Sequence, residues 1–236
     1  MKKIVILIGN YGSGKTEIAL NMAVKASGEG KSTQVIDLDR INDYFRMSDH
    51  VKLLEDRRID LVSPTFAGSG VTQSSMSAAV ASAFAGDRDL VIFDVGGDPA
   101  GAMSLGRYHA DFSALEPGQL EVLDVVNVRR PMSETSEKLL KLKTDMEAFA
   151  RLSVTGFVHN SNLQTMASAD DLRDGYPVVK QASEMSGIPV VITTGRPAFL
   201  NEFLSDGGLD GRFIGTPLPL EPFMRRSWDD FAFGGI

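Results

Sequence analysis

The sequence predicts an α/β fold in which a doubly wound, mainly parallel sheet lies between two layers of helices. Three observations support this prediction. A largely apolar run at the N-terminus leads into a glycine-rich loop, strand-like and helix-like segments alternate along the chain, and carboxylates follow two of the strand-like segments. Parallel strands need helical crossovers, so this alternation is typical of βαβ units. At 236 residues the chain is long enough for one such domain. We expect residues 1–236 to form a single domain.

The first predicted element is a buried parallel strand at Lys3–Ile8. It is followed by Gly9–Thr16, which fits the pattern G-x-x-x-x-G-K-[ST] at every fixed position. Apolar residues at helical spacing between Thr16 and Ala26 predict the helix that this motif requires. The order of strand, loop and helix predicts a P-loop NTPase with a three-layer αβα architecture. A glycine-rich turn without a ligand is the other interpretation.

The residue types in this loop suit phosphate binding. Glycines let the backbone turn so that successive N–H groups face phosphate oxygens, and the following helix adds the positive end of its dipole. Lys15 would reach the β- and γ-phosphates, and Thr16 would offer its hydroxyl to Mg²⁺. The predicted nucleotide-binding residues of this segment are Gly9, Asn10, Gly12, Ser13, Gly14, Lys15, Thr16 and Glu17.

The second predicted strand, Thr33–Asp39, delivers two carboxylates at its end. Asp37 and Asp39 are two residues apart, so the strand period puts both on one face. Ligands of open α/β sheets gather at the carboxyl ends of the strands, which would let both residues face the nucleotide or its metal. The alternative is an acidic turn that caps the next segment.

Residues 40–70 are the least regular part of the sequence. We expect a helix near Ser48–Arg57 and a short strand at Ile59–Ser63, followed by a helix of small residues at Val71–Ala85. Aromatic residues precede the first of these elements. They form either a switch or partner surface beside the nucleotide, or an ordinary part of the core.

The third predicted strand, Asp89–Asp94, continues into Val-Gly-Gly-Asp, which is a Walker B arrangement. A carboxylate at the end of such a strand holds Mg²⁺, usually through water, and a glycine three residues later lets a backbone N–H approach the γ-phosphate. Thr16 and Asp94 are therefore the predicted metal ligands, with Asp39 as a further candidate, and Gly97 joins the nucleotide-binding residues. A loop of this kind can move when the phosphate leaves. Taken alone, Asp94 would as readily be a helix cap.

The second half of the chain repeats the alternation without a further catalytic motif. Strands are predicted at Leu120–Val128, Ser153–His159 and Ile188–Thr193, the last clear strand, and helices at Ser133–Arg151 and Ser168–Gly187. The first of these helices carries an apolar stripe that we expect to face the core: Leu139, Leu142, Met146 and Phe149.

The composition excludes several functions. The chain has no cysteine, which excludes disulfides, thiolate zinc sites, iron–sulfur ligation and cysteine nucleophiles, and favours a cytoplasmic location. A net charge of −7 without a cluster of basic residues argues against a nucleic-acid partner. No segment approaches a membrane span. Three scattered histidines without metal-like spacing are interpreted as structural: His50, His109 and His159.

The C-terminal segment, residues 221–236, is rich in aromatic side chains and is a candidate docking tail. It would pack on the domain or cover a neighbouring molecule. Membrane binding is disfavoured, because the segment holds only one basic pair beside an acidic pair.

The P-loop, the Asp-x-Asp ending and the Asp-Val-Gly-Gly-Asp segment together resemble the MinD/ParA family of P-loop ATPases. That family also includes the nitrogenase iron protein and cobyrinate synthase-like proteins. The resemblance runs from about Lys3 to Ile192, and it implies ATP and Mg²⁺ as cofactors and a nucleotide-dependent homodimer. It further implies that Asp39 positions the attacking water, that Asp94 binds Mg²⁺ through water, and that Asn160 contacts the base near residues 194–197.

Two departures from this family stand out. Members that hydrolyse ATP as a sandwich dimer carry a signature lysine after the first P-loop glycine, and here that position is Asn10. Four arginines are candidates to replace the charge of the missing lysine: Arg40, Arg107, Arg129 and Arg130. The second departure is the absence of cysteine, which excludes an iron–sulfur cluster.

The choice of base is predicted from the residues after Asn160. A guanine site of the N-K-x-D kind would need an acidic residue three positions after Asn160, where Leu163 stands, so ATP is favoured over GTP.

The leading hypothesis is a Mg-ATP-binding ATPase that acts as a nucleotide-dependent switch on a partner protein, with Lys15, Asp39 and Asp94 as catalytic residues. The alternative is an ATP-dependent small-molecule kinase or ligase of the dethiobiotin or cobyrinate synthase type, which Asn10 in place of the lysine makes more plausible. A third hypothesis is a nucleotide-binding scaffold with negligible hydrolysis.

Overall fold

The computed structural model describes residues 3–39, 47–63, 80–163 and 166–224. Within these residues, eight strands form one sheet, every neighbouring pair is parallel, and the order is β3-β2-β4-β1-β5-β6-β7-β8. The strands are β1 (Lys3–Ile8), β2 (Thr33–Asp37), β3 (Ile59–Val62), β4 (Leu90–Asp94), β5 (Leu120–Val126), β6 (Gly156–His159), β7 (Val190–Gly195) and β8 (Thr216–Pro219). The predicted parallel α/β sheet is thus confirmed.

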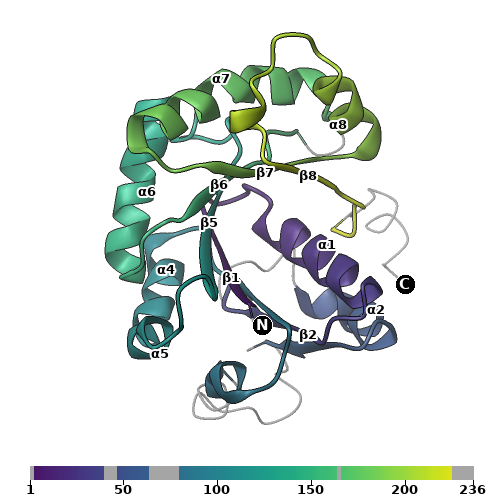
Figure 1. Ribbon diagram of the computed structural model, residues 1–236, viewed down its shortest axis with the longest axis vertical. Coiled ribbons are helices and arrows are strands. Elements are labelled where there is room, and N and C mark those ends of the chain that lie inside the picture. The colour runs from purple at the N-terminus through teal and green to yellow at the C-terminus, as the bar shows by residue number, and fades with distance from the viewer. Residues whose placement is uncertain (1–2, 40–46, 64–79, 164–165, 225–236) are drawn as a thin grey trace, which may run out of the picture.

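Helices cover both faces of the sheet (Figure 1). The α-helices are α1 (Lys15–Gly28), α2 (Val51–Asp56), α4 (Pro99–Gly106), α5 (His109–Ser113), α6 (Ser136–Ala150), α7 (Ala169–Ser186) and α8 (Pro197–Leu204). Short 3₁₀ helices, η1 (Met47–His50) and η3 (Gly211–Phe213), complete the described elements. None of the described helices is both long and apolar enough to cross a membrane.

Strand β1 lies inside the sheet and shows why the two faces differ. Its side chains alternate between two separate cores, as the two-residue period of a strand requires. Ile4, Ile6 and Ile8 pack with residues of α4, α5 and α6, whereas Val5 and Leu7 pack with residues of α1 and α2. Both sides of the strand are therefore apolar, and its carboxyl end carries the P-loop to the same edge at which β2, β4 and β5 end.

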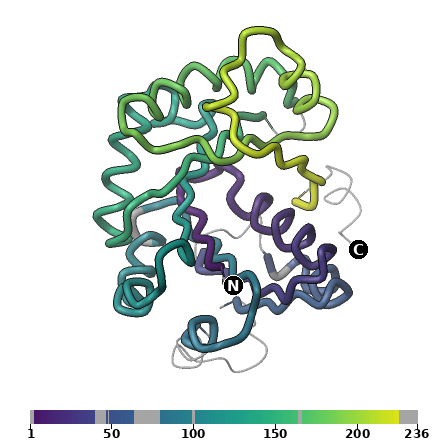
Figure 2. The backbone as a smooth tube through the Cα atoms, in the orientation of Figure 1, coloured from purple at the N-terminus to yellow at the C-terminus, as the bar shows by residue number. Residues whose placement is uncertain are grey.

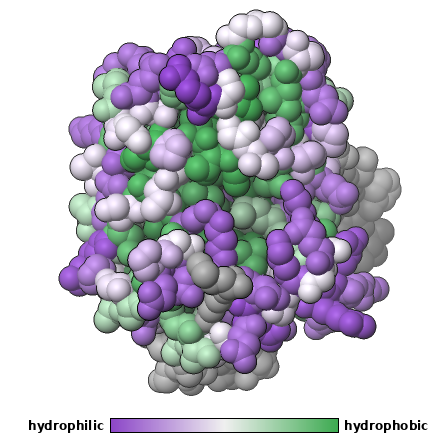
Figure 3. Space-filling view, in the orientation of Figure 1, coloured by the Kyte–Doolittle hydropathy of each residue, from purple (hydrophilic) through white to green (hydrophobic). Residues whose placement is uncertain are grey.

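Hydrophobic side chains are visible in a band across the middle and upper part of the space-filling view, with hydrophilic side chains around it (Figure 3). In the same orientation, strands β7 and β8 run between α7 and α1 (Figure 1).

Several predicted boundaries need correction. Strand β2 ends at Asp37 rather than Asp39, and the backbone N–H of Asp39 turns back to donate to the Asp37 carboxylate over 2.9 Å. The two carboxylates therefore do not share one strand face. The helix predicted at 48–57 is a 3₁₀ turn followed by α2, and of the helix predicted at 71–85 only residues 80–85 lie within the described part, where they are helical.

The apolar stripe of α6 was predicted correctly in part. Leu139 and Met146 are buried and Leu142 is partly buried, but Phe149 is 40% exposed and Ala150 is buried in its place. The reason is geometric: a helix of 3.6 residues per turn drifts from a seven-residue repeat, so the core-facing position moves one residue along.

Four elements were not predicted, namely α4, α5, α8 and β8. Strand β8 is Thr-Pro-Leu-Pro, whose two prolines resemble a loop in sequence. It is an edge strand, so only one of its sides needs hydrogen-bond partners in the sheet, and prolines are tolerated there. The strand predicted at 188–193 is consequently not the last one.

The chain beyond β8 returns to the first helix. Figure 2 shows the yellow C-terminal segment running beside the purple α1, although the two are separated by most of the sequence. Their contact is confirmed by hydrogen bonds between residues about two hundred positions apart.

Candidate functional site

The P-loop connects β1 to α1 and depends on its glycines. Gly9, Gly12 and Gly14 have φ angles of 133°, 70° and 96°, in the region that residues with side chains seldom adopt. A Cβ atom on Gly9 would also lie 2.5 Å from the carbonyl oxygen of Val125 in β5. The glycines of the motif are therefore required both for the backbone turn and for close packing against the neighbouring strand.

The Lys15 side chain is buried under this loop. Its ammonium donates hydrogen bonds to the carbonyl oxygens of Gly9 and Asn10, each over 3.0 Å. Burial lowers the pKa of Lys15 below its ordinary value of 10.5, and the carboxylates of Asp94 and Asp39 oppose this shift. An ammonium held by loop carbonyls and faced by carboxylates is ready to exchange those partners for phosphate oxygens.

Asp94 ends β4 and is 1% exposed. Among the described residues, neither of its carboxylate oxygens has a hydrogen-bond partner at normal distance. Burial raises its pKa to about 6, while the Thr16 hydroxyl and the Lys15 ammonium oppose the shift. A buried carboxylate with unsatisfied oxygens beside a hydroxyl fits Mg²⁺, which needs few protein oxygens when phosphates and water supply the rest. Among the described residues, no group of three or more His, Cys, Asp or Glu side chains that could hold a metal ion is found.

The two aspartates after β2 have different environments. Asp39 lines the cavity described below, whereas Asp37 is buried and pairs in register with Asp94 of β4. Burial raises the pKa of Asp37 to about 8, and the nearby charge of Asp94 adds to the shift. The Ser63 hydroxyl donates to Asp37 over 3.2 Å. Burial therefore favours the neutral form of the Asp37 carboxyl, and Asp39 is the one of the two aspartates that reaches the cavity.

A third buried carboxylate, Asp124 of β5, was missed in the sequence. It pairs in register with Ile8, immediately before the P-loop, and its Oδ1 atom would lie 3.0 Å from a Cβ on Gly9. Burial raises its pKa to about 7, with Lys15 opposing the shift. The available signal was a single acidic residue inside the otherwise apolar strand end Val122–Val126.

Gly97 packs directly against the P-loop. A Cβ atom at this position would lie 2.5 Å from the Tyr11 nitrogen and 2.6 Å from its Cα. One residue later, the Asp98 side chain accepts a hydrogen bond from the Gly101 N–H over 2.7 Å and caps α4. The loop after Asp94 thus links the P-loop to the first turn of a helix within five residues.

Asn160 follows β6 and is also tied to the P-loop. Its Nδ2 atom donates to the Ser13 carbonyl over 2.7 Å, and its Oδ1 atom accepts from the Thr194 hydroxyl over 2.6 Å. A Cβ on Gly14 would lie 2.4 Å from Nδ2, which explains the glycine at that position. The residue before Asn160, His159, is fully buried, and burial lowers its pKa to about 4. His159 is therefore neutral and structural, as predicted.

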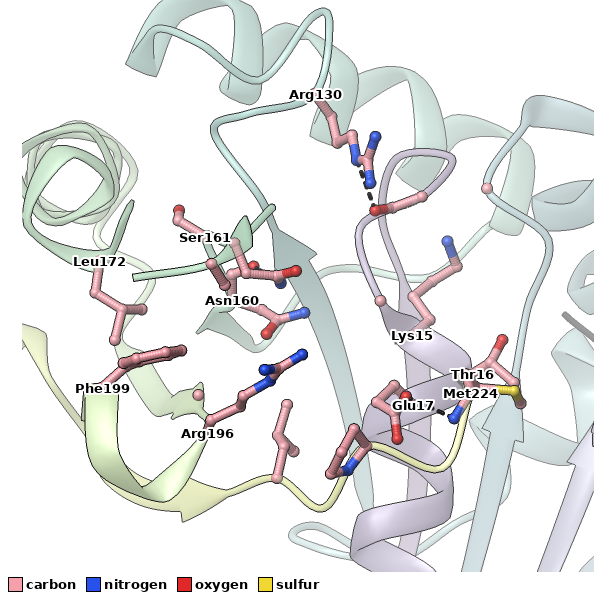
Figure 4. A pocket seen from close by; sticks show the side chains of 18 of the residues that line it. Lys15, Thr16, Glu17, Arg130, Asn160, Ser161, Leu172, Arg196, Phe199 and Met224 are labelled. Carbon is pink, nitrogen blue, oxygen red and sulfur yellow. Dashed lines mark hydrogen bonds between the residues drawn. The ribbon is translucent and has the colours of Figure 1, made fainter. Parts of the chain in front are cut away.

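These segments surround one cavity of about 380 Å³. At one end lie the P-loop, Asp39, Gly97 and Arg130, and at the other end lie Leu172 and Phe199. Figure 4 shows Arg130 and Lys15 on the P-loop side and Leu172 and Phe199 on the opposite side, with Asn160 and Arg196 between them. The cavity therefore has a polar end and an apolar end. The predicted residues that line it are Gly12, Gly14, Lys15, Thr16, Glu17, Asp39, Gly97 and Asn160.

The C-terminal segment forms part of the cavity wall through Leu220, Pro222 and Met224. Side chains of α1 hold it in place. The Glu17 carboxylate accepts hydrogen bonds from the backbone N–H groups of Phe223 and Met224, over 2.7 and 3.0 Å. Asn21 forms a pair of bonds with the backbone of Glu221, over 2.7 and 2.9 Å. Residues 225–236, most of the predicted docking tail, lie outside the described residues.

The structure places the four candidate arginines in different environments. Arg130 lines the polar end of the cavity. Arg129 instead forms ion pairs with Asp171 and Asp174 of α7, and Arg107 is exposed at the end of α4. Arg40 lies outside the described residues.

No protein-family model matches the chain, and no curated protein sequence matches it. Among solved structures, its fold is similar to those of FtsY proteins. FtsY of Mycoplasma mycoides has a TM-score of 0.55 at 17% identity, over 82% of this chain and 60% of that one. The cell division protein FtsY of Thermotoga maritima has a TM-score of 0.56 at 22% identity, over 87% and 69%.

A third structure, the signal recognition particle receptor FtsY of Elizabethkingia anophelis in complex with GDP, has a TM-score of 0.52 at 20% identity, over 82% and 57%. The chain thus spans about three fifths of the length of the first of these proteins. These likenesses show the fold: the chain has the three-layer α/β architecture of P-loop NTPases. The resemblance to MinD/ParA ATPases beyond this fold stays a prediction.

Proposed function

We propose that this protein binds and hydrolyses ATP with Mg²⁺ and acts as a nucleotide-dependent switch. One observation carries the proposal. The P-loop, the Asp39 carboxylate and Gly97 come from three different connections, and they meet at one end of a single cavity. A triphosphate at that end would lie on the backbone N–H groups of the P-loop, at the positive end of the α1 dipole.

The apolar end of the cavity favours adenine. Its lining includes Leu172 and Phe199, which suit a flat aromatic ring. Guanine offers N–H donors that normally pair with a carboxylate. Among the described lining residues the only acids are Glu17, which already accepts two backbone N–H groups, and Asp39 at the polar end. GTP is the second candidate, because one of the similar FtsY structures contains GDP.

The hydrolysis step needs positioning more than covalent chemistry. Asp39 orients a water whose oxygen bonds to the γ-phosphorus, while the bond to the β,γ-bridging oxygen breaks. ADP leaves with that electron pair, and the proton of the water ends on the released phosphate. Lys15 and the loop N–H groups stabilise the negative charge that spreads over the phosphate oxygens.

Thr16 and Asp94 would hold the metal, the latter through water, with Asp39 as a further ligand. When bound, Mg²⁺ neutralises charge on the β- and γ-phosphates. The unsatisfied, buried oxygens of Asp94 support this assignment.

The output of the switch is proposed to be α4. Gly97 contacts the P-loop, and Asp98 caps α4 directly after it, so loss of the γ-phosphate would alter the start of that helix. A second copy of the chain or a partner protein would read this change.

Equilibrium binding of ATP and GTP, with Mg²⁺ and with EDTA, tests the proposal. We expect Lys15→Ala to weaken ATP binding by about 10- to 100-fold, because a charge-assisted contact with phosphate is lost. Lys25→Ala is the matched control, since Lys25 is exposed near the end of the same helix. ATP binding that does not change in Lys15→Ala would contradict the proposal, and tighter binding of GTP would replace ATP by the second candidate.

Solution mass tests the switch. We expect the Asp39→Ala variant, which retains ATP because the water-orienting group is missing, to change its oligomeric state between Mg-ATP and Mg-ADP. An identical mass in both states would argue against self-association as the output.

A further inference from the structure

The connection between β5 and α6 contains a tight turn at residues 130–133. The backbone N–H of Ser133 donates to the carbonyl of Arg130 over 3.1 Å, and Pro131 occupies the second position. Met132, at the third position, has a φ angle of +67°. Type II turns require a positive φ there and usually have glycine, so a methionine in this conformation is held by contacts outside the turn.

Asn10 of the P-loop supplies those contacts. Its Nδ2 atom donates to the carbonyl oxygen of Pro131 and lies 3.3 Å from the Ser133 hydroxyl. Its Oδ1 atom accepts from the N–H of Tyr11 over 2.8 Å, which fixes the orientation of the amide. Asn10 therefore joins the P-loop to the turn through a neutral side chain. In the MinD/ParA family, which the sequence resembles, the signature lysine stands at this position.

The turn holds Arg130 over the P-loop. The Arg130 Nε atom donates to the Gly12 carbonyl over 2.9 Å, across 118 positions of sequence. Figure 4 shows this bond, with the guanidinium at the P-loop side of the cavity. In the part of the chain that the structure describes, Arg130 has no carboxylate partner within ion-pair distance. The bond from Nε to the Gly12 carbonyl fixes the position of the guanidinium. Its two terminal nitrogens remain available to bind an anion.

The geometry points to Arg130 as the cation that stabilises the terminal phosphate from within the same chain, with Asn10 as the residue that positions it. This inference rests on the proposed function and deepens it. In the step described above, charge moves onto the γ-phosphate oxygens and the bridging oxygen as the phosphorus–oxygen bond breaks. A planar guanidinium binds such oxygens in pairs and stays charged at every physiological pH. The charge that a signature lysine would deliver from a second subunit is thus supplied in cis.

Nucleotide affinity and hydrolysis in Arg130→Ala and Arg130→Lys test the role of the guanidinium. We expect Arg130→Ala to weaken ATP binding by about tenfold or more while ADP binding changes by less than about threefold, since only ATP has the terminal phosphate. Hydrolysis should fall by more than the ATP affinity does, and Arg130→Lys should restore it in part. Arg107→Ala is the control, an exposed arginine at the end of α4.

A double-mutant cycle tests the role of Asn10. We expect Asn10→Ala to lower hydrolysis in the wild-type background and to have little further effect in Arg130→Ala, because Asn10 acts through Arg130. Additive losses would overturn the positioning role. Arg130→Ala mixed with Lys15→Ala should remain as slow as either variant alone. Recovery of hydrolysis in the mixture would overturn the assignment in cis, since only the Lys15→Ala chain could supply the guanidinium to its partner.

Different results would overturn the proposed function and the role of Arg130. Wild-type protein that binds neither ATP nor GTP overturns the proposed function, and this inference falls with it. An equal loss of ATP affinity in Arg107→Ala and Arg130→Ala would indicate a general charge effect and overturn the specific role of Arg130. Binding and hydrolysis that persist in Arg130→Ala, with the wild-type ratio of ATP to ADP affinity, overturn this inference alone.

Discussion

The side-chain amide of Asn160 donates a hydrogen bond to the backbone carbonyl of Ser13 over 2.7 Å, and so connects the end of β6 to the middle of the P-loop. The same amide accepts a hydrogen bond from Thr194 at the end of β7. Asn160 is 2% exposed, so its donor and its acceptor are both used within the protein. The P-loop is thereby held by a strand two places away in the sheet.

This relationship predicts the effect of Asn160→Asp. The variant keeps the acceptor for Thr194 but replaces the donor by a carboxylate oxygen that faces the Ser13 carbonyl. We expect the free energy of unfolding to fall by about 1–3 kcal/mol, the cost of an unsatisfied buried carbonyl, and ATP affinity to fall with it. Thermal denaturation measures the first effect. Asn201→Asp, an exposed position on α8, is the control, and equal melting temperatures for the two variants would contradict the prediction.

The contact of Gly97 with Tyr11 predicts that Gly97→Ala is disruptive. The added Cβ would meet backbone atoms of the P-loop at 2.5 to 2.9 Å, and backbone cannot rotate out of the way as a side chain can. We expect a loss of about 1–3 kcal/mol in unfolding free energy, as for overpacking in a well-packed core, together with weaker ATP binding.

Gly28→Ala is the matched control for Gly97→Ala. Gly28 ends α1 and has no positive φ angle, and an added Cβ would meet no neighbouring atom of the described residues within 4 Å. Alanine in place of glycine in a helix should raise stability by a few tenths of a kcal/mol to about 1 kcal/mol. Destabilisation of similar size in both variants would mean that the P-loop contact is not responsible.

The attachment of the C-terminal segment predicts a local effect of Asn21→Ala. The variant loses both hydrogen bonds to Glu221, each worth about 0.5–1.5 kcal/mol, so amide hydrogen exchange at Glu221 and Met224 should become about 5- to 150-fold faster. ATP affinity should fall as well, because this segment forms a wall of the cavity. Exchange that stays at the rate of Lys25→Ala, an exposed position on the same helix, would show that Asn21 does not hold the segment.

The buried carboxyls predict how stability depends on pH without nucleotide or metal. The pKa values of Asp37, Asp94 and Asp124 are raised to about 8, 6 and 7, from an ordinary value of 3.8. The folded protein therefore binds more protons than the unfolded chain between about pH 4 and pH 8. The contribution of these three carboxyls to stability is highest at the acid end of this window and falls as pH rises through their raised pKa values. The lowered pKa of His159 acts in the opposite direction below about pH 6.5.

Asp37→Asn tests this assignment, because the amide removes the titrating group that has the highest of the three pKa values. We expect the variant to raise the melting temperature more at about pH 8 than at about pH 5, because the raised pKa of Asp37 favours its neutral form at the lower pH. Asp56→Asn, an exposed position on α2, should leave the pH profile unchanged. A profile of Asp37→Asn that is parallel to wild type would exclude Asp37 as the source of the pH dependence.

Local patterns in the sequence were sufficient to predict the loop that lies at the polar end of the cavity. The P-loop motif, the apolar period of β1 and α1, and Asp94 at the end of β4 are encoded within short stretches. The motif constrains the backbone directly, since its glycines have φ angles open mainly to glycine, and this physical requirement is visible in the residues themselves. For the same reason the parallel α/β architecture could be predicted before any contact was known.

The remaining features depend on which strands become neighbours, and only the tertiary structure decided them. Four arginines were equivalent in the sequence, and the contact between Arg130 and Gly12 exists only because β5 lies beside β1. Likewise the pKa of Asp37 is raised because the sheet buries it and, next in size, because β2 places it beside Asp94 of β4. The spacing of apolar residues indicates which face of a helix or strand is buried. Which carboxyl becomes buried, and which of the four arginines reaches the P-loop, depends on residues that the fold brings together from distant parts of the chain.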